Sequence, residues 1–502
     1  MEKISDTRFG STEFRLGTWN PCFEDFVQTF SDYYTISLLL INRVILELIM
    51  MGGEFVTNLK EIKIMKLFGD SNINHSIPLN ESGITFIHGP NGCGKTTILK
   101  LVSAFFNSDF GCLIDTRFEK MILAFNNNTL EIEQYRGIVR KELPDHEPII
   151  TKLVFTLNEN KHDAFILVPS DLPTTSISPG DVDEYLPFMS RIGPREWIDR
   201  STGEHYSFTE VLKMHGSKFP NLFLNIEKPA WLAEIQNSIS LNFIKTQRLL
   251  RVNYPINRRQ RNEEPVSSDV VQIYADQMKE IILKKLTEQA TIAQNYDRSF
   301  PERLLAPSHR TDITETEIRA KYTETDKRIQ KLVEAGLIDA QKNIPLPNKN
   351  LLDTERTVLS LYLEDVNQKL AVFNELQEKI QVFLEIVANK LGNKIFKVDR
   401  ELGFRIHPQH NKEERLLPAQ LSSGEQHQIV LFFELIFKAK PNTLFVVDEP
   451  EISLHVDWQR SFYNDIHKIS HLGKHQFLIA THSPQVIGGH RELAISLGEG
   501  IL

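Results

Sequence analysis

Closely spaced glycines, a lysine and a threonine near residue 90 fit the pattern G-x-x-x-x-G-K-T. The apolar run 83–88 before them predicts a strand, and residues 95–106 after them predict a helix. Such a loop can wrap backbone N–H groups around phosphate oxygens at the positive end of the helix. We expect Lys95 to reach the β- and γ-phosphates of a nucleotide and Thr96 to ligate Mg²⁺. The predicted phosphate-binding residues are Gly89, Pro90, Asn91, Gly92, Cys93, Gly94, Lys95, Thr96 and Thr97.

A second candidate site is an apolar run, 444–447, that ends in two acids, Asp448 and Glu449. A buried parallel strand has this composition, and ligands bind at the carboxyl ends of such strands. Asp448 could hold Mg²⁺, directly or through water, and Glu449 could orient or deprotonate an attacking water. The alternative is a strand followed by an acidic loop that carries no chemistry.

A third motif, Ser422-Ser423-Gly424-Glu425, precedes a long apolar helix. Serine is a good N-cap, and a helix N-terminus can bind an anion. Taken alone, the motif could be a helix cap and nothing more. His482 follows a further predicted strand at 477–480, in the segment A-T-H-S-P.

These motifs and their order along the chain resemble those of ABC-type ATPases. The matching segments are Walker A at 89–96, the signature at 421–426, Walker B at 444–449, a D-loop at 449–455 and the switch histidine, His482. The resemblance implies an α/β P-loop ATPase fold with two lobes. It also implies ATP and Mg²⁺ as ligands, with Lys95, Glu449 and His482 as catalytic residues. Ser422 and Gly424 would then contact the γ-phosphate bound to another subunit of a head-to-tail dimer.

One further glutamine belongs to this resemblance. Gln247, at the end of the predicted strand N-F-I-K-T-Q, resembles the Q-loop glutamine that would link the γ-phosphate to the helical insertion. Gln134 is the competing candidate, and a polar linker residue is the alternative for both.

The long interval between lysine and signature contains a predicted helical region. Heptad spacing predicts a coiled coil over 359–391, because nine of ten seam positions are apolar. A helix at about 270–295 could be its antiparallel partner, and a buried helix in a bundle is the alternative. The seam positions are Leu359, Leu363, Val366, Leu370, Phe373, Gln377, Ile380, Leu384, Val387 and Leu391. The predicted domains are an N-terminal extension with an amphipathic helix (1–56), ATPase lobe I (57–250), a helical coiled-coil insertion (251–393) and ATPase lobe II (394–502).

Composition narrows the class of protein. The net charge of −9 excludes a globally basic nucleic-acid binder, although a cluster of basic residues within 245–261 could contact DNA or form a solvated linker. Three cysteines without a C-x-x-C pair exclude a disulfide scaffold and favour the cytoplasm. The apolar run 36–51 contains Asn42, Arg43 and Glu47 and is too short to span a membrane.

A finer resemblance concerns the sequences L-S-S-G-E-Q-H and D-E-P-E-I-S-L-H. They resemble ATPases of prokaryotic anti-phage defence, most of all the PtuA family of the Septu system, which works with an HNH nuclease subunit, PtuB. The related overcoming-lysogenization-defect ATPases carry a Toprim nuclease on the same chain, and the short segment after His482 leaves no room for one. We therefore expect an ATPase that is not itself a nuclease and that scaffolds and gates one.

Other classes of ATPase remain alternatives at this stage. A DNA-repair clamp of the RecF or SMC type would explain the coiled coil and the basic cluster without a nuclease. A transporter ATPase subunit would not need so long an insertion. A ribosome-acting ABC factor resembles two cassettes in one chain, whereas this sequence has one Walker A motif.

Overall fold

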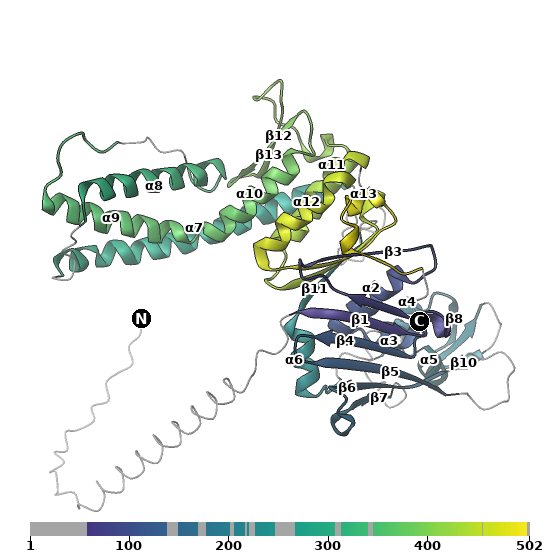
Figure 1. The fold of residues 1–502 in the computed structure, drawn as a ribbon. Helices are drawn as coiled ribbons and strands as arrows, with labels where there is room; N and C mark the ends of the chain where they lie inside the picture. Colours follow the sequence, from purple (N-terminus) through teal and green to yellow (C-terminus); the bar gives the residue numbers. More distant parts are fainter. Residues whose placement is uncertain are drawn as a thin grey trace, which may run out of the picture. The chain divides into compact units, whose positions relative to one another are not determined.

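The computed structural model describes residues 58–137, 149–168, 177–200, 205–215, 218–219, 226–245, 267–306, 313–339, 345–453 and 455–498 (Figure 1). Four features of the sequence lie outside these residues: the N-terminal extension, its apolar run, Gln247 and the basic cluster beyond Lys245. No helix within the described ranges is both long and apolar enough to cross a bilayer.

A five-stranded parallel sheet forms the centre of the ATPase unit and confirms the strands predicted beside the motifs. Its order is β11-β14-β15-β3-β16. Strand β3, near the start of the described chain, therefore lies between β15 and β16, near its end. The helical insertion follows β11 in the sequence and precedes β14, and these two strands are neighbours in the sheet. The strands are β3 (Ile84–His88), β11 (Ser240–Lys245), β14 (Thr443–Asp448), β15 (Gln476–Ala480) and β16 (Ala494–Ser496).

Both faces of this sheet are covered, which explains why β14 is apolar at every position from Leu444 to Val447. Leu444 and Val446 belong to one hydrophobic core, whereas Phe445 and Val447 belong to another. Successive strand residues point to opposite faces, so a strand buried on both sides loses the alternation of apolar and polar residues.

The first core lies between the parallel sheet and a six-stranded antiparallel sheet of order β2-β1-β4-β5-β6-β7. Helix α2 (Lys95–Phe106) packs against β11, β14 and β15 and contributes nine buried residues to this layer. Helices α3 (Phe110–Asp115) and α6 (Ala230–Ser238) contact α2. The antiparallel strands are β1 (Leu59–Met65), β2 (His75–Pro78), β4 (Lys120–Phe125), β5 (Thr129–Gly137), β6 (Ile149–Leu157) and β7 (Phe165–Leu167).

The segment between β7 and β11 contains a small sheet of order β10-β9-β8. Trp197 is fully buried in it, and its indole N–H donates to Asp183. The elements are α4 (Pro179–Tyr185), β8 (Met189–Gly193), β9 (Glu196–Asp199), β10 (His205–Ser207) and α5 (Phe208–His215).

The insertion consists of α7 (Ser267–Leu305), α8 (Glu315–Glu334), α9 (Asp353–Ala371) and α10 (Asn374–Ala388) (Figure 1). Helices α7 and α9 are antiparallel, as predicted for the upstream partner, because Arg303 pairs with Asp365 and Asp297 pairs with Lys369. Helix α8 lies beside α9, where the Arg328 guanidinium donates to the side chain of Asn367 at 2.9 Å.

The heptad seam differs from the prediction in one respect: it runs through two helices instead of one. Helix α9 ends at Ala371 and α10 begins at Asn374. Beyond this break Phe373, Ile380 and Val387 are fully buried in the second core, together with residues of α11. This half of the seam therefore packs as a buried helix against several elements, which was the alternative to a two-helix coiled coil.

The remaining elements belong to the second core, which lies on the other face of the parallel sheet. They are the hairpin β12 (Lys394–Asp399) and β13 (Gly403–Pro408), and the helices α11 (Ser423–Phe437), α12 (Val456–Gly473) and α13 (Pro484–Ile487). Gly403 has a positive φ of 70°, and a Cβ there would collide with the backbone of Ala275 in α7. The hairpin turn is thus packed directly on the base of the insertion.

Candidate nucleotide-binding site

The glycine-rich loop joins β3 to α2, as predicted, and α2 begins at Lys95. Gly92 and Gly94 have φ of 85° and 101°, in the left-handed region that favours glycine. A Cβ on Gly94 would also collide with the side chain of Leu67, from the turn after β1. Backbone conformation and close packing therefore both require glycine at this position.

Lys95 is almost completely buried, and its ammonium group lies against the start of the loop. Its Nζ donates to the carbonyl oxygens of Gly89 at 3.0 Å and Pro90 at 3.1 Å. These bonds fold the side chain back over the loop from the first turn of α2. The amine therefore lies at the loop that is predicted to bind a phosphate.

The two motifs predicted to hold magnesium meet directly. The hydroxyl of Thr96 donates to Oδ1 of Asp448 at 3.0 Å, although 352 positions separate them in the chain. Parallel pairing of β14 with β15, and of β15 with β3, brings the ends of these strands to the same edge. Two oxygen ligands of this kind fit Mg²⁺, which binds through one or two protein oxygens and substrate phosphates.

The electrostatics of Asp448 also fit a cation. Burial raises the pKa of Asp448, and the hydrogen bond from Thr96 and the charge of Lys100 oppose that rise. A carboxylate that burial penalises is stabilised by a nearby positive charge. The residues present therefore suit a magnesium ion between Thr96 and Asp448.

Glu449, the residue after Asp448, has a strained backbone conformation with φ of 49°. Its N–H donates to the carbonyl of Ala480 at 2.9 Å, which ties the end of β14 to the end of β15. Its Oε1 lies 3.8 Å from Nε2 of His482. The structure therefore brings together the predicted carboxylate and the predicted switch histidine.

Glu451 is a functional candidate that sequence reasoning did not single out. Its carboxylate accepts from the Thr481 hydroxyl at 2.9 Å and from the His482 N–H at 2.6 Å. It thus fixes the backbone that carries His482 to the segment after Asp448 and Glu449. The signal available in the sequence was a third acid in D-E-P-E, directly after the apolar run 444–447.

The signature residues form the N-terminus of α11. Ser422 is the N-cap, with its hydroxyl accepting from the Glu425 N–H, and the Glu425 carboxylate accepts in return from the Ser422 N–H at 2.8 Å. Lys394 pairs with Glu425 at 2.6 Å. Burial works to raise the pKa of Glu425, but the bonds from Lys394 and Ser422 prevail and hold that pKa below its usual value. The predicted helix cap is confirmed.

Gly424 of this motif faces α12. A Cβ at Gly424 would lie 3.2 Å from the ring of Trp458. Ser423 is the first residue of the helix, and α11 also packs against α7 and α10. The signature is therefore held between the insertion and the helix that follows the Walker B loop.

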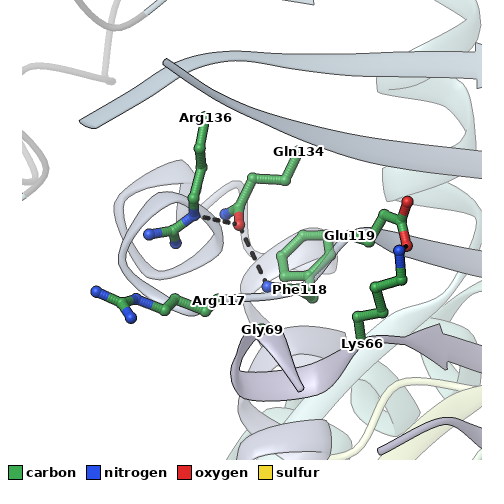
Figure 2. Close-up of a pocket in the computed structure, with 7 residues that line it drawn as sticks. All are labelled: Lys66, Gly69, Arg117, Phe118, Glu119, Gln134 and Arg136. Carbon is green, nitrogen blue, oxygen red and sulfur yellow. Dashed lines mark hydrogen bonds and ion pairs between the residues drawn. The ribbon is translucent and has the colours of Figure 1, made fainter. Parts of the chain in front are cut away.

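Gln134, the alternative Q-loop residue, is hydrogen-bonded to the backbone between α3 and β4. It is buried on β5, and its amide Nε2 donates to the carbonyls of Leu113 and Thr116 at the end of α3. Its Oε1 accepts from the Phe118 N–H and from Arg136 (Figure 2). The pocket in Figure 2 is lined by Lys66, Gly69, Arg117, Phe118, Glu119, Gln134 and Arg136. Gln134 thus caps α3 and orients an arginine of lobe I.

Phe68 is a second residue that sequence reasoning did not single out. It lies in the turn after β1 with φ of 60°, and its N–H donates to the Arg117 carbonyl at 2.7 Å. Its ring is 43% exposed, and Cε2 lies 3.6 Å from the position of a Cβ on Gly94. An exposed aromatic face beside a phosphate-binding loop can stack on a base. A strained aromatic in the turn K-L-F-G is not distinguishable by sequence from an ordinary loop residue.

Taken together, the strand-loop-helix unit, the buried lysine and the threonine–aspartate pair define a P-loop ATPase with an α/β core and a helical insertion. Comparison with protein families agrees. The family model described as "AAA ATPase domain" matches residues 71–487, and the chain belongs to that family.

The solved structures that this chain is similar to include heads of SMC proteins. The SMC head of Pyrococcus furiosus, with an extended coiled coil and bound to the C-terminal domain of ScpA, is 13% identical, with 88% of this chain and 94% of that chain covered at a TM-score of 0.31. The SMC head of Thermotoga maritima is 11% identical, with 87% and 92% covered at a TM-score of 0.29. No curated protein matches the sequence.

Proposed function

We propose that this protein is an ABC-type ATPase subunit of a cytoplasmic anti-phage complex, in which ATP binding gates a separate HNH-type DNA nuclease of the PtuB kind. The observation that carries the ATPase part is the 3.0 Å bond between Thr96 and Asp448. The gating part is supported by the resemblance to PtuA and by the packing of the insertion on the signature helix.

Within one chain, the residues have complementary tasks. The loop N–H groups and Lys95 bind the phosphates, and Thr96 and Asp448 hold the magnesium ion. A magnesium ion held there would supply positive charge that offsets the negative charge of the phosphates. Glu449 orients the attacking water and accepts its proton, and His482 contributes a hydrogen bond at the γ-phosphate. Glu451 keeps His482 in place through its backbone N–H.

A second copy of the chain would complete the site. Three apolar side chains are exposed near the signature (421–426) and near the segment that resembles a D-loop (449–455). They are Leu417, exposed by 57%, Ile452 by 56% and Val456 by 48%. Apolar groups this exposed, beside a helix N-terminus that can bind an anion, suit a protein–protein contact across bound ATP. In a head-to-tail dimer, Ser422 and Gly424 would then reach the γ-phosphate of the partner.

The insertion has direct connections to the helices that carry the site. Lys390, just after α10, pairs with Asp465 of α12 in a buried contact of 2.6 Å. Helix α7 packs on α11, and the Tyr274 hydroxyl donates to Glu434. Closure of a dimer around ATP would therefore move or strain the insertion, which is a route from nucleotide to nuclease.

The alternative proposal is a DNA-repair clamp of the RecF or SMC type. The antiparallel pair α7 and α9 supports it, since such a pair can serve as a DNA-gripping arm without a nuclease partner. The two proposals differ in the protein that binds this chain.

Native mass spectrometry of the tagged chain, expressed with its neighbouring genes, tests the choice. Co-purification of a small HNH protein with an oligomer of this chain supports gating, and nuclease activity should then change with ATP. Lys95→Ala is the matched control, because it should abolish the ATP response and leave the complex intact. A bare dimer that forms only with ATP or DNA would favour the clamp, and a nuclease equally active with and without ATP would refute gating.

A further inference from the structure

A histidine of lobe I contacts the phosphate-binding loop from outside. Nε2 of His75, the first residue of β2, lies 2.9 Å from the carbonyl oxygen of Cys93. A carbonyl oxygen can only accept a hydrogen bond, so Nε2 must carry the proton and donate it. Burial lowers the pKa of His75, and the bond to Cys93 opposes that effect. The ring is half-buried between the antiparallel sheet and the loop.

The bond to His75 also sets the direction of the Gly94 N–H, which belongs to the same peptide group as the Cys93 carbonyl. In a planar trans peptide the C=O of one residue and the N–H of the next point in opposite directions. Holding the Cys93 carbonyl toward His75 therefore directs the Gly94 N–H away from His75. The Gly94 carbonyl accepts from the Ile98 N–H at 2.8 Å in the first turn of α2. Gly94 is the N-cap of α2, so its N–H is one of the donors that a helix N-terminus can offer to an anion.

The same hairpin fixes Gly94 a second time. Leu67, in the turn between β1 and β2, packs on Gly94, and the ends of that turn are joined by the Leu67 N–H to the Ile73 carbonyl at 3.0 Å. His75 pairs with Ile64 across the two strands, so the ring is carried by rigid sheet backbone. The Cys93 N–H makes only a long contact of 3.5 Å with the Pro90 carbonyl.

We propose that His75 is a positioning residue for nucleotide binding: its Nε2–H locks the Cys93–Gly94 peptide so that the Gly94 N–H is ready to bind a phosphate oxygen. The inference rests on the proposed binding of ATP by this loop and is independent of any nuclease. His75 does not touch the reacting atoms. Its loss should weaken ATP binding, because the free loop then samples other orientations of this peptide, and should leave the rate of the saturated enzyme nearly unchanged.

Three substitutions separate the hydrogen bond from the bulk of the ring. His75→Phe keeps a ring and removes the donor. His75→Gln places an amide nitrogen three bonds from Cβ, as Nε2 is in histidine, and should restore the bond. In His75→Asn the amide nitrogen is one bond closer to Cβ, so it should not reach the Cys93 carbonyl and should not restore the bond. Equilibrium titration with a fluorescent ATP analogue and Mg²⁺ gives the affinity, and steady-state ATP hydrolysis gives kcat and KM.

We expect Phe and Asn to raise the dissociation constant and KM about threefold to tenfold, the effect of one net hydrogen bond, with kcat changed less than twofold. Gln should lie within twofold of the wild type. Equal affinities for Phe, Asn and wild type would overturn the inference, as would a Gln variant as weak as Phe. If Phe fails to fold, the comparison of Gln with Asn decides the question.

A failure of ATP binding itself is recognised separately. The wild-type chain should bind the analogue and Lys95→Ala should not. If the wild type does not bind, or Lys95→Ala binds equally well, the loop is not the nucleotide site and both proposals fall. If that pair behaves as expected and the His75 variants bind like the wild type, only the positioning role is refuted.

Discussion

The buried pair of Lys390 and Asp465 offers a stability test with a magnitude that can be calculated. The two side chains are 3% and 9% exposed and their charged atoms lie 2.6 Å apart, where α10 meets α12. Lys390 Nζ also donates to the Ser461 hydroxyl at 2.8 Å and lies over the ring of Phe432. Lys390→Met keeps most of the apolar stem and removes the charge. Asp465 is then left buried, with the Ser461 hydroxyl as a hydrogen-bond donor and the charge of Lys468 in the neighbourhood.

The loss of stability caused by Lys390→Met has an upper limit, because Asp465 can take up a proton instead of remaining charged and buried. Burial already raises the pKa of this carboxyl, against the opposing effect of Lys390. Without the ammonium, the folded variant holds Asp465 in its neutral form. Keeping a carboxyl of ordinary pKa near 3.9 protonated at pH 7 costs about 4 kcal/mol, and at pH 5 about 1.5 kcal/mol. A folded-state pKa above the unfolded value means stability that is present at low pH and lost as pH rises.

The assay is urea unfolding followed by tryptophan fluorescence, since Trp458 lies in the same helix as Asp465. We expect Lys390→Met to lose about 3–4 kcal/mol at pH 7 and roughly 1–2 kcal/mol at pH 5. The double variant Lys390→Met with Asp465→Leu should lie within about 1 kcal/mol of the wild type or above it, because neither charge is then buried alone. A loss below about 1 kcal/mol at pH 7, or an equal loss at both pH values, would refute the reasoning.

Three further predictions concern the site. Glu449→Gln should lower kcat about 10²- to 10⁴-fold with ATP affinity nearly unchanged, in single-turnover hydrolysis and nucleotide titration; a kcat within threefold of the wild type would remove Glu449 from the base role. Ser422→Ala should cost about 1 kcal/mol in urea unfolding through loss of the N-cap, with Ser423→Ala as the matched control, and equal effects would contradict the capping geometry. The lowered pKa of Glu425 means that its contribution to stability is present at neutral pH and lost as pH falls through the folded value, so Glu425→Gln should lower stability at pH 7, and this loss should shrink as the pH falls below 4.5.

Much of the local structure could be read from short stretches of sequence. Residues 95–106 form a helix with the predicted bounds, because glycine at position 94 permits the left-handed turn before it. The Ser422–Glu425 box is equally local, since a serine and an acid three positions later satisfy each other's backbone donors. The alternation of β1 and the continuous apolar run of β14 also revealed which strand has one buried face and which has two.

Other features depended on contacts between distant segments. The break between α9 and α10 interrupts a heptad pattern that is nearly unbroken in sequence, because the second half of the seam is buried against lobe II. The role of Gln134 could likewise not be predicted from the sequence, since only the folded structure shows that its amide caps α3. A pattern records which positions are apolar or polar, but not which partner buries them.

Short stretches of sequence are enough to predict the phosphate-binding loop, the acidic strand end and the capped signature helix, because each is a property of a few consecutive residues. Only the tertiary structure decided that Thr96 meets Asp448, that Glu451 holds the backbone of His482, and that His75 reaches the loop. Those contacts follow from the order of strands in the parallel sheet and from the docking of the β1–β2 hairpin. Such an order is set by the burial of both sheet faces over the whole chain, which no local pattern specifies.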